Sequence, residues 1–260
     1  MLYLLHLYQT RMKTPFLLVL YCISLGSLAQ TTSQPFKPGC ALPFEEIKVK
    51  HNIDKTCPIK GKPTKTNTKA NEKQNRIKNN FCASGDPKSM KVQDFIDLHK
   101  EVMKKEISFG SASSVPENRT ELTNLGEGTV VSFTGYIEHV KYSNVSGGES
   151  VNCKKGGVEN NDIHIELVET KTEEDACKRI SAEISPHYRP ETWNVDNLSE
   201  VEDKKIKIRL TGQLFFDASH GACPDNEEGY RASSWEIHPV YKIEVYVSKK
   251  WIDLHEWLED

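Results

Sequence analysis

Two segments near the C-terminus combine carboxylate and imidazole side chains at short spacing. Asp217 and His220 lie in TGQLFFDASHGAC, and Glu236 and His238 lie in SSWEIHPVYKIEV. Histidines and carboxylates are the groups that bind Zn²⁺, Mn²⁺ or Fe²⁺, and a histidine beside a carboxylate can serve as a general base. The residue types therefore indicate a divalent-metal site or an acid–base site.

The full set of titratable candidates is spread over several segments and comprises Asp162, His164, His187, Asp217, His220, Glu236 and His238. Each has a structural alternative. Asp217 can hydrogen-bond its own backbone in a turn, and His238 is restricted to an extended conformation by Pro239. No H-E-x-x-H spacing is present, so spacing alone identifies no metal. The candidate metal ligands are His164, Asp217, His220 and His238.

Basic side chains favour a different chemistry, the binding of a ligand without catalysis. Lys205, Lys207 and Arg209 alternate along one segment and would share one face of a strand. This leading interpretation requires no cofactor, whereas the alternative, a metal-dependent hydrolase of phosphodiesters, requires a divalent metal. An oligonucleotide, a glycan and an envelope component remain open as ligands. The candidate ligand contacts are His164, Lys205, Lys207, Arg209, Asp217, His220, Glu236 and His238.

Alternating hydropathy predicts the strands that carry these groups. In DIHIELVE, the apolar Ile163, Ile165 and Leu167 share one face, and Asp162 and His164 lie on the other. The same pattern continues in other segments, and a short helix is predicted after Pro190. The predicted strands are 129–143, 162–169, 179–186, 204–217 and 235–247.

The order of these elements predicts the fold class. A long first strand with an interior Gly135, two more strands, a helix and two final strands is the order of an OB-fold. We therefore expect a mainly β protein, a five-stranded OB-like Greek-key barrel over residues 129–260. Ligands of such barrels usually lie at the first and fourth loops, here 141–161 and 217–234. The tail after the fifth strand is predicted to form a helical turn that packs Trp251, Leu254 and Leu258 inward.

The region before the barrel is predicted to be an N-terminal irregular and helical extension. Residues 30–110 are polar, and 30–88 are expected to be irregular because they have few apolar residues. One helix is predicted at about 89–106, with Ser89 as its N-cap and His99 packed on its apolar face. Residues 111–128 are rich in Gly, Ser, Pro and Asn and are expected to form a linker.

The first 29 residues resemble a secretory signal. A basic start at Lys13 is followed by an apolar run and small residues at Ser27 and Ala29, which predicts cleavage after Ala29. Met1 and Met12 both remain open as the start. We expect a periplasmic or extracellular location and no transmembrane segment in the mature chain; the oligomeric state stays open.

Cysteines and charge narrow the classes of function. The chain has seven cysteines, and Cys22 would leave with the signal. An even set in an exported chain predicts disulfides, with 15 pairings open. The net charge of −3 disfavours general nucleic-acid binding, which needs basic faces. The disulfide candidates are Cys40, Cys57, Cys82, Cys153, Cys177 and Cys223.

Several of these motifs together resemble exported bacterial proteins of unassigned activity. The segments are VNCKKGGVENNDIHIEL, IRLTGQLFFDASH and SSWEIHPVYKIEV, with NNFCASGDP upstream. The similarity extends over most of the mature chain, and W-E-I-H-P-V is its most specific motif. The resemblance implies an OB-like barrel similar to anticodon-binding domains, and it implies no particular reaction.

Overall fold

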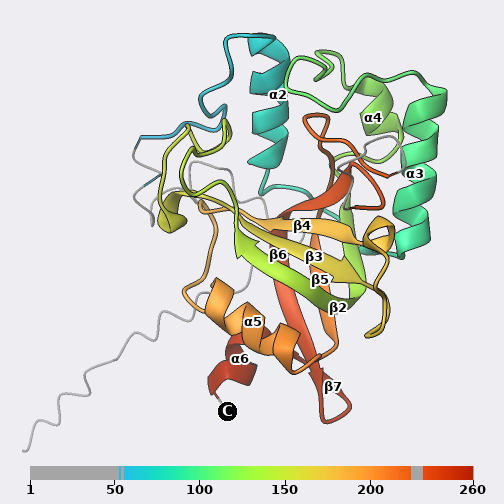
Figure 1. The fold of residues 1–260 in the computed structure, drawn as a ribbon, viewed down its shortest axis with the longest axis vertical. Coiled ribbons are helices and arrows are strands. Elements are labelled where there is room, and N and C mark those ends of the chain that lie inside the picture. Colours follow the sequence, from blue (N-terminus) through green and yellow to red (C-terminus); the bar gives the residue numbers. More distant parts are fainter. Residues whose placement is uncertain (1–52, 54–55, 224–230, 260) are drawn as a thin grey trace, which may run out of the picture. The chain divides into compact units, whose positions relative to one another are not determined.

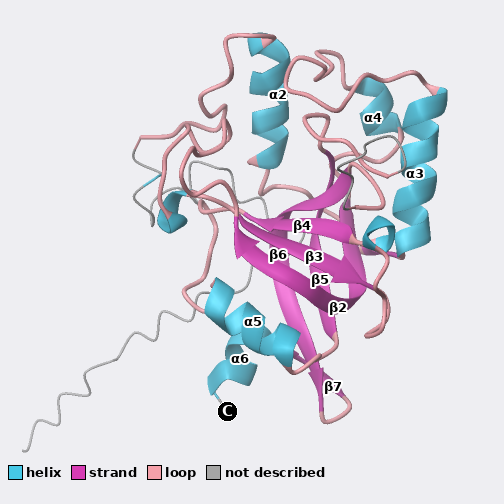
Figure 2. Ribbon diagram, in the orientation of Figure 1, coloured by secondary structure: helices cyan, strands magenta, loops and turns pink. Residues whose placement is uncertain are grey.

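A computed structural model describes residue 53 and residues 56–223 and 231–259 of the chain. The predicted signal 1–29 and Cys40 lie outside the described residues. The part described is mainly β, with helices at both ends of a barrel (Figures 1 and 2). The barrel strands are β2 (Val130–Tyr142), β3 (Ile163–Val168), β4 (Ile180–Ile184), β5 (Ile208–Phe216) and β6 (Trp235–Val247).

The strand pairing closes this barrel in the OB order. β2, β3 and β4 form an antiparallel meander, and β4 then pairs with β6 in parallel. β5 pairs antiparallel with both β6 and β2, which completes the ring. The predicted fold class, a five-stranded OB-like barrel, is confirmed. The fourth strand begins at Ile208 rather than at 204, because Lys204 still caps the preceding helix.

Gly135 explains how β2 can pair with two different strands of the barrel. β2 pairs with β5 up to Gly135 and with β3 from Tyr136 onward. A Cβ atom at Gly135 would lie 2.1 Å from the carbonyl oxygen of Val168, so a side chain has no room there. The strand is also shifted in register between Ile137 and His139. The bend predicted from this glycine is therefore present.

Apolar side chains at alternate positions of the strands point inward and fill the barrel. Ile165, Ala182, Leu210, Ile237 and Ile243 are all 0 % exposed. Burying each of the leucine and isoleucine side chains contributes roughly 1.5–3 kcal/mol relative to exposure. One end of the barrel carries two helices, α5 (Val195–Asp203) and α6 (Leu254–Glu259), as Figure 1 shows.

The C-terminal tail differs in part from its prediction. Residues Lys250–Asp253 form a short strand, β7, which pairs with β6 before α6 begins. Trp251 therefore contacts Tyr246 in a tilted arrangement, with ring centroids 5.0 Å apart, instead of packing inward from a helix. Leu254 is buried as expected, and Leu258 is partly buried against the core.

The segment expected to be irregular contains a helix, α2 (Thr68–Lys78). The prediction over these residues is wrong because hydropathy patterns detect only helices with an apolar stripe. In α2 the buried stripe consists of Ala70 and four polar residues, Asn71, Gln74, Asn75 and Lys78. These positions have helical spacing, but amides and an ammonium group take the place of apolar side chains.

The other elements before the barrel follow the predictions more closely. The predicted helix is α3 (Val92–Lys104), with His99 4 % exposed. Its N-cap is Lys91 and not Ser89, since residues Lys88–Met90 form β1, which pairs in parallel with β2. The predicted linker contains a short helix, α4 (Thr120–Asn124). None of the helices described has the length and apolar character that crossing a membrane requires.

Two disulfides join the loops to the extension and to each other. Cys57 pairs with Cys153 in the β2–β3 loop, and Cys177 before β4 pairs with Cys223 after β5. The first bond ties the segment that precedes α2 to the first barrel loop. Each bond therefore includes one cysteine of a predicted ligand loop, Cys153 in 141–161 or Cys223 in 217–234.

Candidate functional site

The polar side chains that alternate with the apolar ones face outward, and α2 covers those of Glu183 on β4 and Glu236 on β6. Glu183 on β4 lies opposite His164 on β3 in the strand register. Ala182 lies opposite Ile237 in the parallel pair, which places His238 beside Glu183. Glu183 and His238 are 6 % and 0 % exposed although they point away from the barrel core. Acidic and imidazole groups are thus buried between the barrel wall and the N-terminal extension.

Lys78, at the C-terminal end of α2, inserts into this group of acids. Its Nζ lies 3.2 Å from Glu183 Oε2, 3.8 Å from Glu149 Oε2 and 3.9 Å from Glu236 Oε1. Burial opposes the charged ammonium group, but the surrounding carboxylates outweigh burial and hold the pKa of Lys78 well above its usual value. We define the Lys78 cluster as Lys78, Glu149, Asp162, Glu183, Glu236 and His238.

Glu183 is the acceptor at the centre of this cluster. His238 Nδ1 lies 2.6 Å from Glu183 Oε2, and His164 Nδ1 lies 3.4 Å from Glu183 Oε1. Burial would raise the pKa of Glu183, but Lys78 and the two histidines together hold it well below its usual value. Burial would likewise lower the pKa of His238, but the carboxylates of Glu183 and Glu236 raise it to about 10. Glu183 and His238 therefore form a charged pair at neutral pH.

Asp162 and His238 each have one polar atom without a hydrogen-bond partner among the described residues. These atoms are Asp162 Oδ2 and His238 Nε2. The other oxygen of Asp162 accepts a hydrogen bond from Asn152 Nδ2 at 3.1 Å. Burial raises the pKa of Asp162 above its usual value. The Lys78 cluster can consequently form further hydrogen bonds or metal–ligand bonds through these two atoms.

Asp217 and His220 form a second pair beside the cluster. His220 Nδ1 lies 2.6 Å from Asp217 Oδ2, and Gln74 of α2 donates to Ser219 Oγ at 2.6 Å. The Asp217 carboxylate raises the pKa of His220 to about 9. Arg231 connects the pair to the cluster, since it lies 3.7 Å from Asp217 and 3.0 Å from Glu236.

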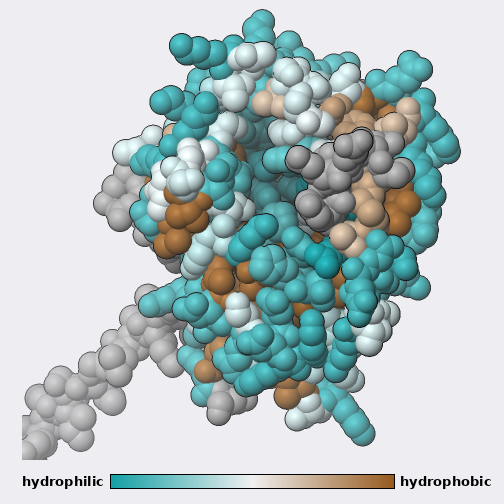
Figure 3. Space-filling model, in the orientation of Figure 1, coloured by the Kyte–Doolittle hydropathy of each residue, from teal (hydrophilic) through white to brown (hydrophobic). Residues whose placement is uncertain are grey.

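Both groups of residues border one polar cavity. This cavity has a volume of about 310 Å³ and lies between α2, the β2–β3 loop and the β5–β6 loop. Figure 3 shows a hydrophilic hollow on this face, where Figure 1 places the C-terminal end of α2. We call this cavity the rim pocket. Polar residues that line it include Asn71, Gln74, Asn75, Lys78, Glu149, Lys154, Ser219 and His220.

Cationic side chains are the most numerous charged groups that line the rim pocket, and two of them, Lys78 and His220, are paired with the buried carboxylates of Glu183 and Asp217. Lys78, Lys154 and His220 each present a cationic group, and Glu149 supplies the single carboxyl group among the described residues that line it. Burial raises the pKa of Glu149 to about 8, so this carboxyl group is largely protonated at neutral pH. The lining of the pocket therefore offers cationic hydrogen-bond donors beside a carboxyl group whose pKa is raised by burial.

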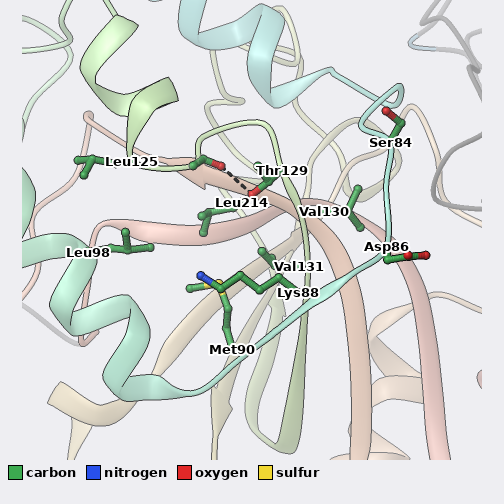
Figure 4. Close-up of a pocket in the computed structure, with 11 residues that line it drawn as sticks. Ser84, Asp86, Lys88, Met90, Leu98, Leu125, Thr129, Val130, Val131 and Leu214 are labelled. Carbon is green, nitrogen blue, oxygen red and sulfur yellow. Dashed lines mark hydrogen bonds between the residues drawn. The ribbon is translucent and has the colours of Figure 1, made fainter.

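A second cavity lies elsewhere and has a different character. It has a volume of about 360 Å³ and is lined mainly by apolar residues from β1, β2, α3 and β5. Figure 4 shows Leu98, Leu125, Val131 and Leu214 around it, with Thr129 hydrogen-bonded to the carbonyl oxygen of Gly126 at 2.7 Å. Among the described residues that line it, none is a histidine and only Asp86 and Lys88 are charged, so these residues offer no comparable chemistry.

The structure separates the candidate metal ligands predicted from sequence into two groups. His164 and His238 both contact Glu183, whereas Asp217 and His220 form their own pair. The group whose ligand atoms all lie within 4.8 Å of one another is Asp162, Glu183 and His238. Glu236 belongs to the cluster, and His187 is fully buried.

The basic candidates on the fourth strand lie apart from the rim pocket. Arg209 makes a two-point contact with Glu244, with distances of 2.7 Å and 2.8 Å. Lys205 lies 3.3 Å from Glu138, and Lys207 is exposed. These residues do not line the pocket.

Sequence reasoning missed Lys78, Glu149 and Glu183. Glu183 alternates with buried isoleucines in RISAEISP, so the parity that identified His164 would also have identified it. Lys78 and Glu149 carry no such signal, because their segments show no strand pattern. No protein-family model, curated protein or solved structure matches this chain.

Proposed function

We propose that this protein is an exported OB-like domain that binds an anionic ligand, such as a phosphate-bearing oligonucleotide, in the rim pocket. The pocket lies at the β2–β3 and β5–β6 loops, which are the places where OB barrels usually bind their ligands. It is lined by side chains that can donate and accept hydrogen bonds. This position and composition support a binding role.

The observation that carries the proposal is the set of cationic groups that line the pocket. Lys78, Lys154 and His220 line it together with the largely protonated Glu149. Cationic donors make the stronger, charge-assisted hydrogen bonds with phosphate and carboxylate oxygens. A local anion site is compatible with the negative net charge, because the positive groups are concentrated at one place.

Export is supported by the disulfides and by the predicted signal. Bonds such as Cys57–Cys153 and Cys177–Cys223 persist in oxidising compartments and are rare in a reducing cytosol. An oligonucleotide, a phosphorylated glycan and an anionic envelope polymer all offer the anionic groups that the pocket suits.

Fluorescence anisotropy with a labelled oligothymidylate tests this function. We expect saturable binding that weakens as salt rises, because binding releases counterions from the phosphates. Lys154→Ala should weaken binding and reduce the salt slope by about 1. Lys207→Ala is the matched control, since this exposed lysine directly precedes the fourth strand and lies outside the pocket.

Two outcomes would contradict the proposal. Equal losses in Lys154→Ala and Lys207→Ala would indicate diffuse attraction to surface lysines and no pocket. Salt-independent binding of a neutral oligosaccharide, with no binding of the oligonucleotide, would show that the ligand is not an anion.

A second candidate, a phosphodiester hydrolase, is favoured by the protonated carboxyl group beside the cationic groups. A general acid works best when its pKa lies near the working pH, and burial brings the pKa of Glu149 to about 8. Turnover of bis-p-nitrophenyl phosphate with added Zn²⁺ or Mn²⁺ tests this function. Glu149→Gln should lower kcat/KM by about 100-fold, whereas His255→Gln should not. Equal turnover in Glu149→Gln would remove the candidate.

A further inference from the structure

We propose that Asp162, Glu183 and His238 form a binding site for a divalent transition-metal ion, Zn²⁺ or Mn²⁺. One ligand atom from each residue lies within 4.8 Å of the other two. Asp162 directly precedes β3, Glu183 lies on β4 and His238 lies on β6, so three neighbouring strands hold the site. The inference deepens the proposed function at the same face of the barrel, and it needs no organic ligand.

Two residues of this group carry a buried polar atom without a hydrogen-bond partner among the residues described. Asp162 Oδ2 and His238 Nε2 have no hydrogen-bond partner among the residues described, and both residues are 0 % exposed. Buried polar atoms are almost always hydrogen-bonded, and one left unsatisfied costs about 1–3 kcal/mol. A carboxylate oxygen and an imidazole nitrogen are both good metal ligands. A bound metal ion that displaces the proton which His238 holds at neutral pH would satisfy both atoms.

The remaining atoms of these ligands are already held in place. His238 Nδ1 lies 2.6 Å from Glu183 Oε2, and a metal-binding histidine commonly donates its other ring N–H group to a carboxylate. Asp162 Oδ1 accepts a hydrogen bond from Asn152 at 3.1 Å. Asp162 and His238 are thus each oriented by one atom and present the other. Both oxygens of Glu183 already contact His238, His164 or Lys78, so Glu183 binds the metal only by giving up one of these contacts.

Lys78 competes with a metal for the same acidic groups. Its ammonium group lies 3.2 Å from Glu183 and also lines the rim pocket. A cation that enters from the pocket therefore meets Lys78 first, and its positive charge repels the metal. Removal of this charge, without loss of the ligands, should strengthen metal binding.

Isothermal titration of the full chain, stripped with EDTA, tests the site with ZnCl₂ and MnCl₂ in separate runs. We expect one saturable site for at least one of the metals. Asp162→Asn should weaken binding by at least about tenfold, a loss typical even of residues that only support a ligand. Lys78→Gln should tighten binding. His255→Gln, a partly exposed histidine on α6 at the other end of the barrel, should change nothing.

Absence of saturable binding by both metals, or unchanged binding in Asp162→Asn, would overturn the site. If Asp162→Asn fails to fold, wild-type NMR replaces it. Mn²⁺ should then broaden the ring signals of His164 and His238 and leave His255 sharp, whereas equal broadening of all three would overturn the site. Loss of oligonucleotide binding alone would refute the proposed function and leave the metal result intact.

Discussion

At the scale of single residues, the buried charges show how environment sets the behaviour of ordinary side chains. Glu149 and Glu183 both lie near Lys78, yet the pKa of Glu149 is raised to about 8 and that of Glu183 is lowered. Glu183 has two histidines and the closest ammonium contact, whereas burial dominates at Glu149. Two acids of the same type can therefore act as a proton donor and as a fixed anion.

The Asp217–His220 pair gives a pH-dependent prediction. The folded-state pKa of His220, about 9, exceeds its unfolded value of about 6.5, so the pair stabilises the fold fully below about pH 6.5. This stabilisation is lost as the pH rises through about 9. Asp217 has a lowered pKa and stays ionised until well below about pH 3.9. Arg231 and Lys78 also face the pair and oppose the charged imidazole.

Urea unfolding of wild type and His220→Gln at several pH values measures this contribution. The difference in unfolding free energy should be greatest between about pH 4 and pH 6.5 and should vanish above about pH 10. Its size should stay below about 1 kcal/mol, because the His220 side chain is 70 % exposed and solvent screens the pair. A difference that does not vary with pH would contradict this account.

At the scale of elements, the alternation of strand residues determined what could be predicted. Ile163 and Ile165 point inward and His164 points outward, so the pattern yielded both the barrel strands and part of the outer site. α2 could not be predicted in this way because Asn71, Gln74 and Lys78 supply its buried stripe. The partner of Glu183 on this helix, Lys78, was missed together with its element.

The sequence pattern also could not predict which of the candidate metal ligands lie close together. Strand parity placed His164, Asp217 and His238 on outer faces, but it gave no distances between strands. The parallel pairing of β4 with β6 brings His238 to Glu183. Asp217 instead turns toward His220 within the same loop. Which candidates come together therefore depends on the order of the strands in the closed barrel.

The bend in β2 supplies a prediction at this scale. Gly135→Ala should destabilise the fold by about 1–3 kcal/mol, because its Cβ would lie 2.1 Å from the backbone oxygen of Val168. Gly147→Ala is the matched control in a loop, where the nearest atom, Asn144 Oδ1, lies 3.4 Å away. That control should change stability by less than about 0.5 kcal/mol. The urea midpoints of the two variants provide the comparison, and equal midpoints would refute a steric role for the bend.

At the scale of the whole molecule, covalent bonds and polar contacts join the extension to the barrel. Cys57–Cys153 attaches the start of the extension to the β2–β3 loop, and Asn75 of α2 accepts a hydrogen bond from Ser150 Oγ in that loop. Gln213 of β5 donates to the carbonyl oxygen of Ile77 at 2.9 Å. The rim pocket exists only while these parts remain together.

The two disulfides should differ in their contribution to stability. The bonds join residues 96 and 46 positions apart. In the chain-entropy model, the longer loop gives about 0.7 kcal/mol more stabilisation, within a usual range of about 2–5 kcal/mol per bond. The double variant Cys57→Ser/Cys153→Ser should therefore unfold at lower urea than Cys177→Ser/Cys223→Ser. The reverse order would show that local packing, and not loop length, decides.

The polar underside of α2 has a practical consequence for protein engineering. Hydropathy profiles would mark the lysine- and asparagine-rich segment before residue 88 as a dispensable tail, and a designer would remove it to obtain a smaller barrel for expression or grafting. Such a truncation would delete Lys78 and leave Glu183 and Glu236 uncovered on the barrel wall. The shortened protein would gain an acidic, hydrated patch in place of a pocket, and screening it for ligands would give misleading negatives.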